Sequence, residues 1–214
     1  CTKVEKPGVE QARDRVLTDK EIKKVWASLD KESKLMSGMY RLRFLTAQRG
    51  GEISNMRRVD IDHDSKWWTI PAKFSKNGKA HRVPLCDAAL EIIEDAIDDG
   101  NKSEWVFPSP TTGGPIESIW KSASRVRKNS GVEFRPHDIR RTVASKMTGD
   151  LEISRLVVSK ILNHVEKGVT AVYDRASYDK DKRIAIDSWG TRLAEIIKGK
   201  AGQGNVYKLR MGGE

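Results

Sequence analysis

Two short segments place cationic side chains where an anion could bind. Arg49 stands in Thr-Ala-Gln-Arg-Gly-Gly-Glu-Ile, and the glycines after it let another backbone come close. A guanidinium is a planar fork that matches two oxygens of a phosphate. His137 and Arg140 are three residues apart after Pro136, which suits the start of a helix, so they share one helical face. Such a pair is costly to bury without an anion, whereas Arg49 alone also fits a solvated helix end.

A lysine, a histidine and a tyrosine are the remaining reactive candidates. Lys76 and Lys79 flank Asn-Gly at a predicted turn, and their spacing does not choose between them. Most lysines at turns are only solvated. His164 lies nine residues before Tyr173, and Tyr178 follows in the same stretch. Each tyrosine also fits a half-buried aromatic position, and propensity does not rank the two.

The elements that must position these groups are mainly helices. Thr18-Asp-Lys-Glu21 has the form of a capping box, and apolar residues follow it at helical spacing. Periodicity, caps and breakers predict helices over residues 18–29, 34–47, 51–56, 87–100, 116–129, 137–148, 153–162 and 180–197.

A small sheet is predicted between residues 58 and 85. Trp67-Trp-Thr-Ile70 has a strand composition, and Pro71 closes it. A second short strand covers residues 82–85, with Pro84 best tolerated at an edge or end. The turn at residues 76–79 would join the two as a hairpin. The predicted fold class is therefore α+β, a mainly helical domain with a small antiparallel sheet of about three strands.

Composition narrows the function. The 214 residues carry a formal charge of +10, which favours a polyanion such as nucleic acid but also fits a merely basic protein. The cysteines are Cys1 and Cys86, too few for a disulfide framework or a metal cluster, which suits a reducing compartment. We expect no cofactor and no metal. The chain has no run of 18 apolar residues, so no membrane span and no membrane partner are expected.

Taken together, these segments resemble the catalytic domain of the tyrosine recombinase (phage integrase) family over residues 15–190. That family shows Arg followed three residues later by Glu, a hairpin lysine before Val-Pro-Leu, and His-x-x-Arg. It then shows Leu-x-His, with Thr six residues and the nucleophilic Tyr nine residues after that His. The matching residues are Arg49, Glu52, Lys76, His137, Arg140, His164, Thr170 and Tyr173. The sequence around the last His and Tyr resembles that of integrases of prophages and genomic islands.

Two departures from the family pattern are visible. Asn163 stands where many members have glycine, and Gly50-Gly51 replaces a more usual single glycine. Neither change removes a reacting group. The resemblance also implies an N-terminal DNA-clamping domain, and in many integrases an arm-binding domain, before Cys1.

The resemblance divides the chain into three parts. Residues 1–14 are expected to be a linker from that missing N-terminal region, and residues 15–198 the catalytic domain. Residues 199–214 form a glycine-rich tail with a short apolar patch. We favour docking of this tail as a strand in the full assembly over disorder.

The reaction that the resemblance implies is site-specific recombination, which integrates or excises a mobile element. Tyr173 attacks phosphorus, a 5′-hydroxyl leaves, and a 3′-phosphotyrosyl link forms without metal or ATP. Arg49 and Arg140 would clamp the non-bridging oxygens. His137 would accept or relay the tyrosine proton, and His164 would donate a hydrogen bond to a phosphate oxygen.

The remaining roles are supporting ones. Lys76 would protonate the leaving 5′-oxygen, Glu52 would orient Arg49 or a neighbouring strand, and Thr170 belongs to the motif. Basic residues expected to follow the DNA backbone are Arg57, Arg58, Arg125, Arg127 and Lys128.

The implied partners are double-stranded DNA attachment sites, three further copies of the chain in a tetramer on DNA, a DNA-bending host factor and an excisionase. The implied location is on DNA in the bacterial cytoplasm. Two rival functions share the basic character: a type IB topoisomerase-like DNA relaxing enzyme and a catalytically silent DNA-binding regulator. The segment from Leu-x-His to Tyr favours an integrase over the first. The complete set of reacting groups argues against the second, and against a merely structural basic domain.

Overall fold

Helix α2 (Lys34–Thr46) is the central element of the fold. Ser33 caps its start, and nearly all of its second half is buried. It contacts α3 (Gly50–Ser54), α4 (Asp87–Asp98), α6 (Pro136–Gly149) and α9 (Asp179–Lys198). This computed structural model describes residues 14–98, 102–164 and 178–199. Most of the predicted linker and tail therefore lies outside the described residues.

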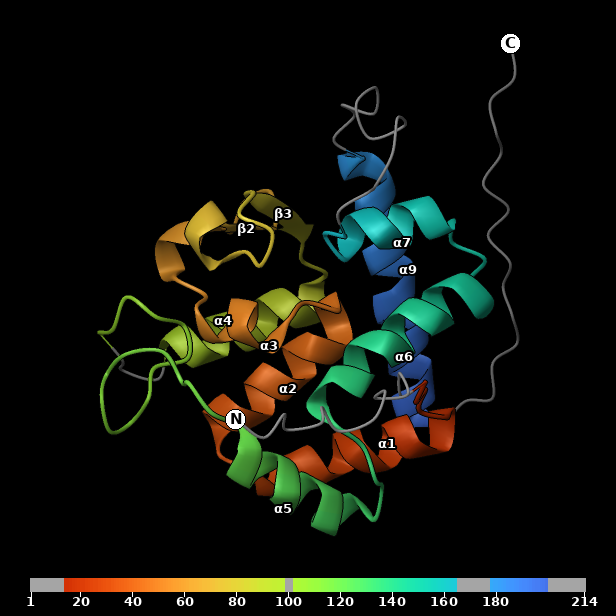
Figure 1. The fold of residues 1–214 in the computed structure, drawn as a ribbon, viewed down its shortest axis with the longest axis horizontal. Helices are drawn as coiled ribbons and strands as arrows, with labels where there is room; N and C mark the ends of the chain where they lie inside the picture. Colours follow the sequence, from red (N-terminus) through yellow and green to blue (C-terminus); the bar gives the residue numbers. More distant parts are fainter. Residues whose placement is uncertain (1–13, 99–101, 165–177, 200–214) are drawn as a thin grey trace, which may run out of the picture.

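Two further helices and a sheet lie at opposite ends of the molecule (Figure 1). At one end, α1 (Asp19–Ser28) packs against α5 (Trp120–Ser130), and the predicted capping box of α1 is present between Thr18 and Glu21. At the other end is the sheet. Helix α7 (Arg155–Ile161) contacts α6 and α9. Helices dominate the described residues, and together with the one small sheet they confirm the α+β class.

The sheet has three antiparallel strands in the order β1 (Ile61–Asp62), β2 (Trp67–Ile70) and β3 (His81–Pro84). Trp68 pairs with Val83, and both are buried, so one face of the sheet joins the core. The predicted small antiparallel sheet of about three strands is confirmed, and β1 is the strand that the sequence did not locate. The predicted hairpin between the two strands is confirmed, with a turn closed by the Gly78 N–H and the Ser75 carbonyl, but the connection is longer than this turn, because Ile70 pairs with His81 and residues 71–80 link the strands. Within it, Gly78 turns the chain at φ +69°.

The helix predictions differ from the structure mainly at their ends. Helix α5 begins at Trp120 rather than at residue 116. The reason is tertiary: Ile116 is buried, and its carbonyl accepts a hydrogen bond from the Ser54 hydroxyl, so this stretch packs as a loop against α3. Helix α7 begins after its cap Ser154.

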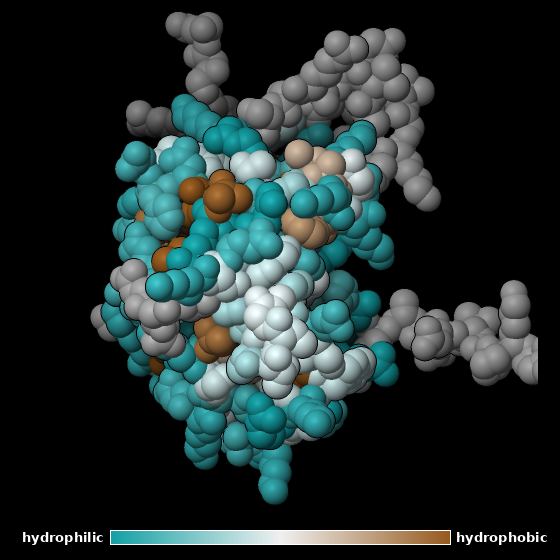
Figure 2. All heavy atoms as spheres, turned by 90° about the vertical axis from the view of Figure 1, so that its left-hand side faces the viewer, coloured by the Kyte–Doolittle hydropathy of each residue, from teal (hydrophilic) through white to brown (hydrophobic). Residues whose placement is uncertain are grey.

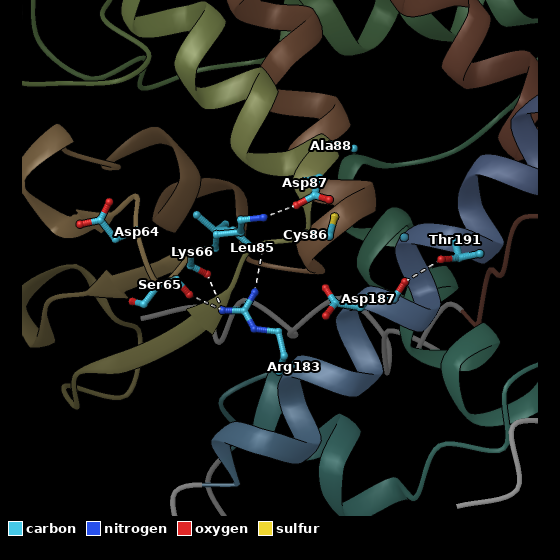
Figure 3. A pocket seen from close by; sticks show the side chains of 11 residues that line it. Asp64, Ser65, Lys66, Leu85, Cys86, Asp87, Ala88, Arg183, Asp187 and Thr191 are labelled. Atoms are coloured by element: carbon cyan, nitrogen blue, oxygen red, sulfur yellow. Dashed lines mark hydrogen bonds and ion pairs between the residues drawn. The ribbon is translucent and has the colours of Figure 1, made fainter.

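Helix α9 is anchored to both α2 and the sheet. The Trp189 indole is fully buried and donates to the Phe44 carbonyl at 2.6 Å. Arg183 donates to the carbonyls of Leu85 at 2.7 Å, Ser65 at 2.8 Å and Lys66 at 2.7 Å (Figure 3). These contacts line a pocket of about 600 Å³ beside the sheet. They fix the N-terminal half of α9 against the sheet.

The described surface is mostly hydrophilic. The face in Figure 2 shows hydrophobic side chains only in small separate groups. The large hydrophobic side chains that are exposed among the described residues are Val59, Trp120, Leu156 and Ile184. None of the described helices is both long and apolar enough to cross a membrane.

Candidate active site

Arg49 is fixed by the carboxylate of Glu52. Arg49 is the N-cap of α3, and its backbone N–H donates to Glu52 Oε2 at 3.0 Å. Its guanidinium also donates to Glu52 Oε1 at 2.9 Å, while the Glu52 side chain is only 2% exposed. One buried carboxylate therefore sets both the backbone and the side chain of Arg49, which supports the predicted orienting role of Glu52.

Arg140 is held from two sides by main-chain carbonyls. Its Nη1 donates to Ala47 O at 2.6 Å, and its Nη2 donates to Leu162 O. Ala47 ends α2 in the left-handed conformation. Burial and, to a smaller extent, the cation of Arg49 lower the pKa of Arg140 to about 10, while the carboxylate of Glu52 opposes both. Arg140 therefore stays charged near pH 7 and lies within the field of Arg49.

The C-terminal end of α7 gathers hydrogen-bond donors from other elements. The Ile161 carbonyl accepts from Gln48 Nε2 at 2.9 Å and lies 3.0 Å from His81 Nε2. The Leu162 carbonyl accepts from Arg140. Carbonyls at a helix end lack intrahelical partners and carry partial negative charge, so they attract such donors. This packing places the segment that leads to His164 beside Arg140.

Two histidines complete the cluster as neutral bases. Burial lowers the pKa of His137, and the cations of Arg140 and Arg141 lower it further. Burial likewise lowers the pKa of His164, followed by Arg140, Arg49 and His137. Because each histidine feels both arginines of the cluster, the four side chains share one local field. A neutral imidazole can accept a proton or donate one hydrogen bond near pH 7.

A pocket of about 370 Å³ opens between α3, α6 and the start of α5, with Arg49, His137 and Arg140 in its wall. Trp120 also lines it and is 68% exposed. The wall thus combines fixed cations and a neutral imidazole with an open aromatic ring. Such a pocket can bind a phosphodiester and stabilise charge on its oxygens.

Arg43 enters the same pocket through a gap left by glycine. Its side chain is largely buried and packs over the Tyr40 ring, with 5.7 Å from guanidinium to centroid. A Cβ at Gly50 would lie 1.5 Å from Arg43 Nη2. The guanidinium therefore occupies the volume that a side chain at residue 50 would need. A larger residue at position 50 would therefore have to displace the Arg43 guanidinium.

Four of the six predicted catalytic residues come together: Arg49, His137, Arg140 and His164. Lys76 is exposed on the connection between β2 and β3. The residues on either side of it, Ser75 and Asn77, are hydrogen-bonded to Asn163. Tyr173 and the supporting Thr170 lie outside the described residues. Tyr178, the other tyrosine, precedes α9, and the Lys160 ammonium lies 5.1 Å from its ring centroid.

The predicted DNA-backbone residues have different environments. Arg57 makes two 2.8 Å hydrogen bonds to Asp60 and lies over the Phe74 ring. Arg125 binds Glu32 at 3.0 and 2.5 Å. The others also differ in exposure: Arg58 and Arg127 are half-buried, whereas Lys128 is exposed. Their role on DNA stays a prediction.

Sequence reasoning missed several residues at or under the site. Arg43, Trp120 and Arg135 line the pocket, and His81 lies buried beneath it. Arg135 directly precedes Pro-His-Asp, and Arg43 interrupts a strongly apolar helix, so the sequence contained a signal for both residues. His81 gave none, because its role depends on a carbonyl 80 residues away. Across the described residues, no three His, Cys, Asp or Glu side chains are grouped to hold a metal ion.

Comparison with known proteins agrees with this arrangement. The chain is 28% identical over 177 residues to prophage integrase IntA of Escherichia coli (strain K12), covering 82% of this chain and 43% of that protein. It is 29% identical over 167 residues to prophage integrase IntZ of the same organism, covering 77% and 40%. The chain thus spans less than half the length of these relatives.

Solved structures share the fold. An integrase from mycobacterium phage Brujita superposes with a TM-score of 0.67 at 17% identity, covering 90% of this chain and 67% of that one. A lambda integrase (75-356) dimer bound to a COC′ core site gives 0.60 at 22% identity, covering 76% and 62%. The model of the phage integrase family matches residues 15–180. With Arg49, His137 and Arg140 in the wall of one pocket and His164 within their electrostatic field, the chain belongs to the phage integrase family.

Proposed function

We propose that this chain is the catalytic part of a site-specific DNA recombinase that cuts and rejoins DNA through a 3′-phosphotyrosyl intermediate. The observation that carries the proposal is the convergence of two fixed guanidiniums and the His137 imidazole in the wall of one pocket, with the His164 imidazole within their electrostatic field. Guanidiniums stay charged and bind phosphate oxygens in pairs, so they can stabilise the transition state without a metal.

In this mechanism Tyr173 is the nucleophile. Its Oη forms the bond to phosphorus, the P–O5′ bond breaks, and its electron pair goes to the leaving oxygen. Arg49 and Arg140 hold the non-bridging oxygens, and His137 takes the phenolic proton. His164 donates a hydrogen bond to the phosphate, and Lys76 gives the leaving oxygen its proton. Lowered histidine pKa values favour the neutral form that a proton acceptor requires.

The proposed partners follow from the reaction. The substrate is a double-stranded attachment site, and strand exchange needs four active sites on two duplexes, hence a tetramer. One neighbouring structure is a lambda integrase tetramer bound to a Holliday junction. We also propose a DNA-bending host factor, an excisionase, and a location on DNA in the bacterial cytoplasm. The parts outside residues 15–198 are proposed to be a linker and a docking tail.

A covalent-trapping experiment tests the proposal. A nicked suicide duplex built on a candidate core site is incubated with the wild-type chain, with Tyr173→Phe and, as a matched control, with Tyr178→Phe. We expect a protein–DNA adduct at the 3′ end for wild type and Tyr178→Phe, and none for Tyr173→Phe. An adduct that survives in Tyr173→Phe would assign the nucleophile elsewhere.

The same assay separates the rival functions. A wild-type chain that forms no adduct on any core site, even when joined to N-terminal DNA-binding domains, would be a catalytically silent DNA-binding protein. Relaxation of supercoiled plasmid without strand exchange would indicate a type IB topoisomerase-like enzyme instead.

A further inference from the structure

Asn163 joins the two segments that carry Lys76 and His164. It follows α7 in the left-handed conformation at φ +49°, which Asn tolerates better than other residues with a side chain. Its Nδ2 donates to Ser75 Oγ at 3.0 Å, and its Oδ1 accepts from Asn77 Nδ2 at 2.8 Å. Its main-chain carbonyl accepts from the same Asn77 amide at 3.3 Å.

The two partners of Asn163 flank Lys76 directly. Ser75 Oγ also donates to Asn77 Oδ1 at 2.8 Å, and that oxygen accepts the Lys79 N–H at 3.1 Å. The Gly78 N–H donates to the Ser75 carbonyl at 3.0 Å. The turn is therefore closed on itself and bonded to Asn163 on both sides of Lys76. Ser75 is buried while Lys76 is exposed, so the backbone is anchored and the ammonium is free to face a substrate.

The other end of this connection is the catalytic cluster. Asn163 lies between Leu162, whose carbonyl binds Arg140, and His164. A glycine here would allow the left-handed backbone but would give the turn no side-chain partner. Asn163 therefore adds a link between Lys76 and the phosphate-binding groups that the backbone alone does not supply.

We propose that Asn163 is a positioning residue that holds residues 75–79 against the end of α7, so that Lys76 reaches the leaving 5′-oxygen. This inference rests on the proposed function and on the role of Lys76 in it. In the step concerned, the P–O5′ bond breaks, and Lys76 Nζ transfers a proton to O5′. Asn163 does not touch the reacting atoms; it reduces the number of positions that the ammonium can occupy.

The test uses Asn163→Gly, which keeps the backbone conformation and removes only the amide. Ser75→Ala is the second variant, because it breaks the same link from the opposite side. Both are compared with wild type, with Lys76→Ala and with Arg140→Ala in single-turnover cleavage of the suicide duplex. A second duplex carries sulfur in place of the scissile 5′-oxygen. A thiol has a pKa of about 8.5, so this leaving group departs without a proton donor.

We expect Asn163→Gly to cleave the oxygen duplex roughly 10- to 100-fold more slowly than wild type. On the sulfur duplex it should approach the wild-type rate, as Lys76→Ala should. Arg140→Ala should be slow on both, because phosphate clamping is still required. Equal slowing of Asn163→Gly on both duplexes, or wild-type rates on the oxygen duplex, would overturn the proposal.

A direct measurement of the turn accompanies the kinetics. Hydrogen exchange of the Gly78 and Lys79 amides should be at least about tenfold faster in Asn163→Gly than in wild type, while amides inside α6 keep their rates. Unchanged exchange rates of these two amides would show that Asn163 does not hold the turn. If wild type forms no adduct on either duplex, the proposed function itself fails; if wild type cleaves and the variant behaves like it, only the role of Asn163 fails.

Discussion

His137 is a neutral base because of its surroundings. Burial lowers its pKa most, the cations of Arg140, Arg141 and Arg49 lower it further, and only Asp138 raises it. The net result is a pKa below the ordinary 6.5. An imidazole with this environment is mostly neutral near pH 7, as the proposed role of His137 as proton acceptor requires.

The pH dependence of adduct formation follows from this pKa. The rate should be insensitive to pH from 6.5 upward and should fall only below pH 6.5, as His137 becomes protonated. In His137→Gln the overall rate should be lower, and this acid limb should disappear. Single-turnover rates between pH 5 and 8 measure both. A rate that already declines between pH 8 and 7 would contradict a lowered pKa.

At the scale of elements, the contact between β3 and α7 depends on a buried histidine. His81 begins β3 and is 7% exposed, with Nε2 3.0 Å from the Ile161 carbonyl. Burial, with smaller effects of Lys182, Arg140 and Arg49, lowers the pKa of His81 to about 4, and the hydrogen bond to the Ile161 carbonyl only partly opposes this. The neutral ring is thus part of the folded state under the active site.

His81 should make the fold sensitive to acid. Its folded pKa lies below the unfolded value, so its contribution is complete above pH 6.5 and is lost as pH falls toward 4. Between these two limits the contribution of His81 to the free energy of unfolding changes by roughly 3 kcal/mol. The free energy of unfolding in urea should fall less between pH 7 and pH 5 in His81→Gln than in wild type. The glutamine amide of this variant can still donate to the Ile161 carbonyl. Equal losses in both proteins would refute this role.

The sequence predicts the elements better than their long-range contacts. The capping box at Thr18 and the strand Trp67–Ile70 depend on neighbouring residues, so local patterns were sufficient. The predicted start of α5 was wrong because the hydrogen bond between Ser54 and Ile116 keeps residue 116 in a loop. The motifs identified Arg49, His137, Arg140 and His164, but the partners of Asn163 were unreadable, because Ser75 and Asn77 are distant in sequence.

At the scale of the whole molecule, the net charge of +10 overstates the cations free to meet DNA. Arg57 is committed to Asp60 and to the Phe74 ring, and Arg125 to Glu32, whereas Lys128 is exposed. Charge pairing inside the fold therefore divides the predicted backbone residues into structural and available ones.

The salt dependence of DNA binding should reveal this division. We expect Lys128→Gln to reduce the slope of log K against log salt by about one without changing the melting temperature. Arg57→Gln should instead lower the melting temperature, because Asp60 loses its partner. Titrations of a non-specific duplex at several salt concentrations, with thermal melts, test both. If Lys128→Gln leaves the slope unchanged, this lysine does not contact the DNA backbone.

The gap at Gly50 also constrains how this site can evolve. Since the Arg43 guanidinium lies in the space that a side chain at residue 50 would need, a larger residue at 50 requires the end of Arg43 to move or Arg43 to be replaced. Replacement of Arg43 by a smaller residue would clear this space while Gly50 is kept, whereas a larger residue at 50 beside Arg43 must displace the guanidinium. The order in which the two residues change therefore affects the cost of each step.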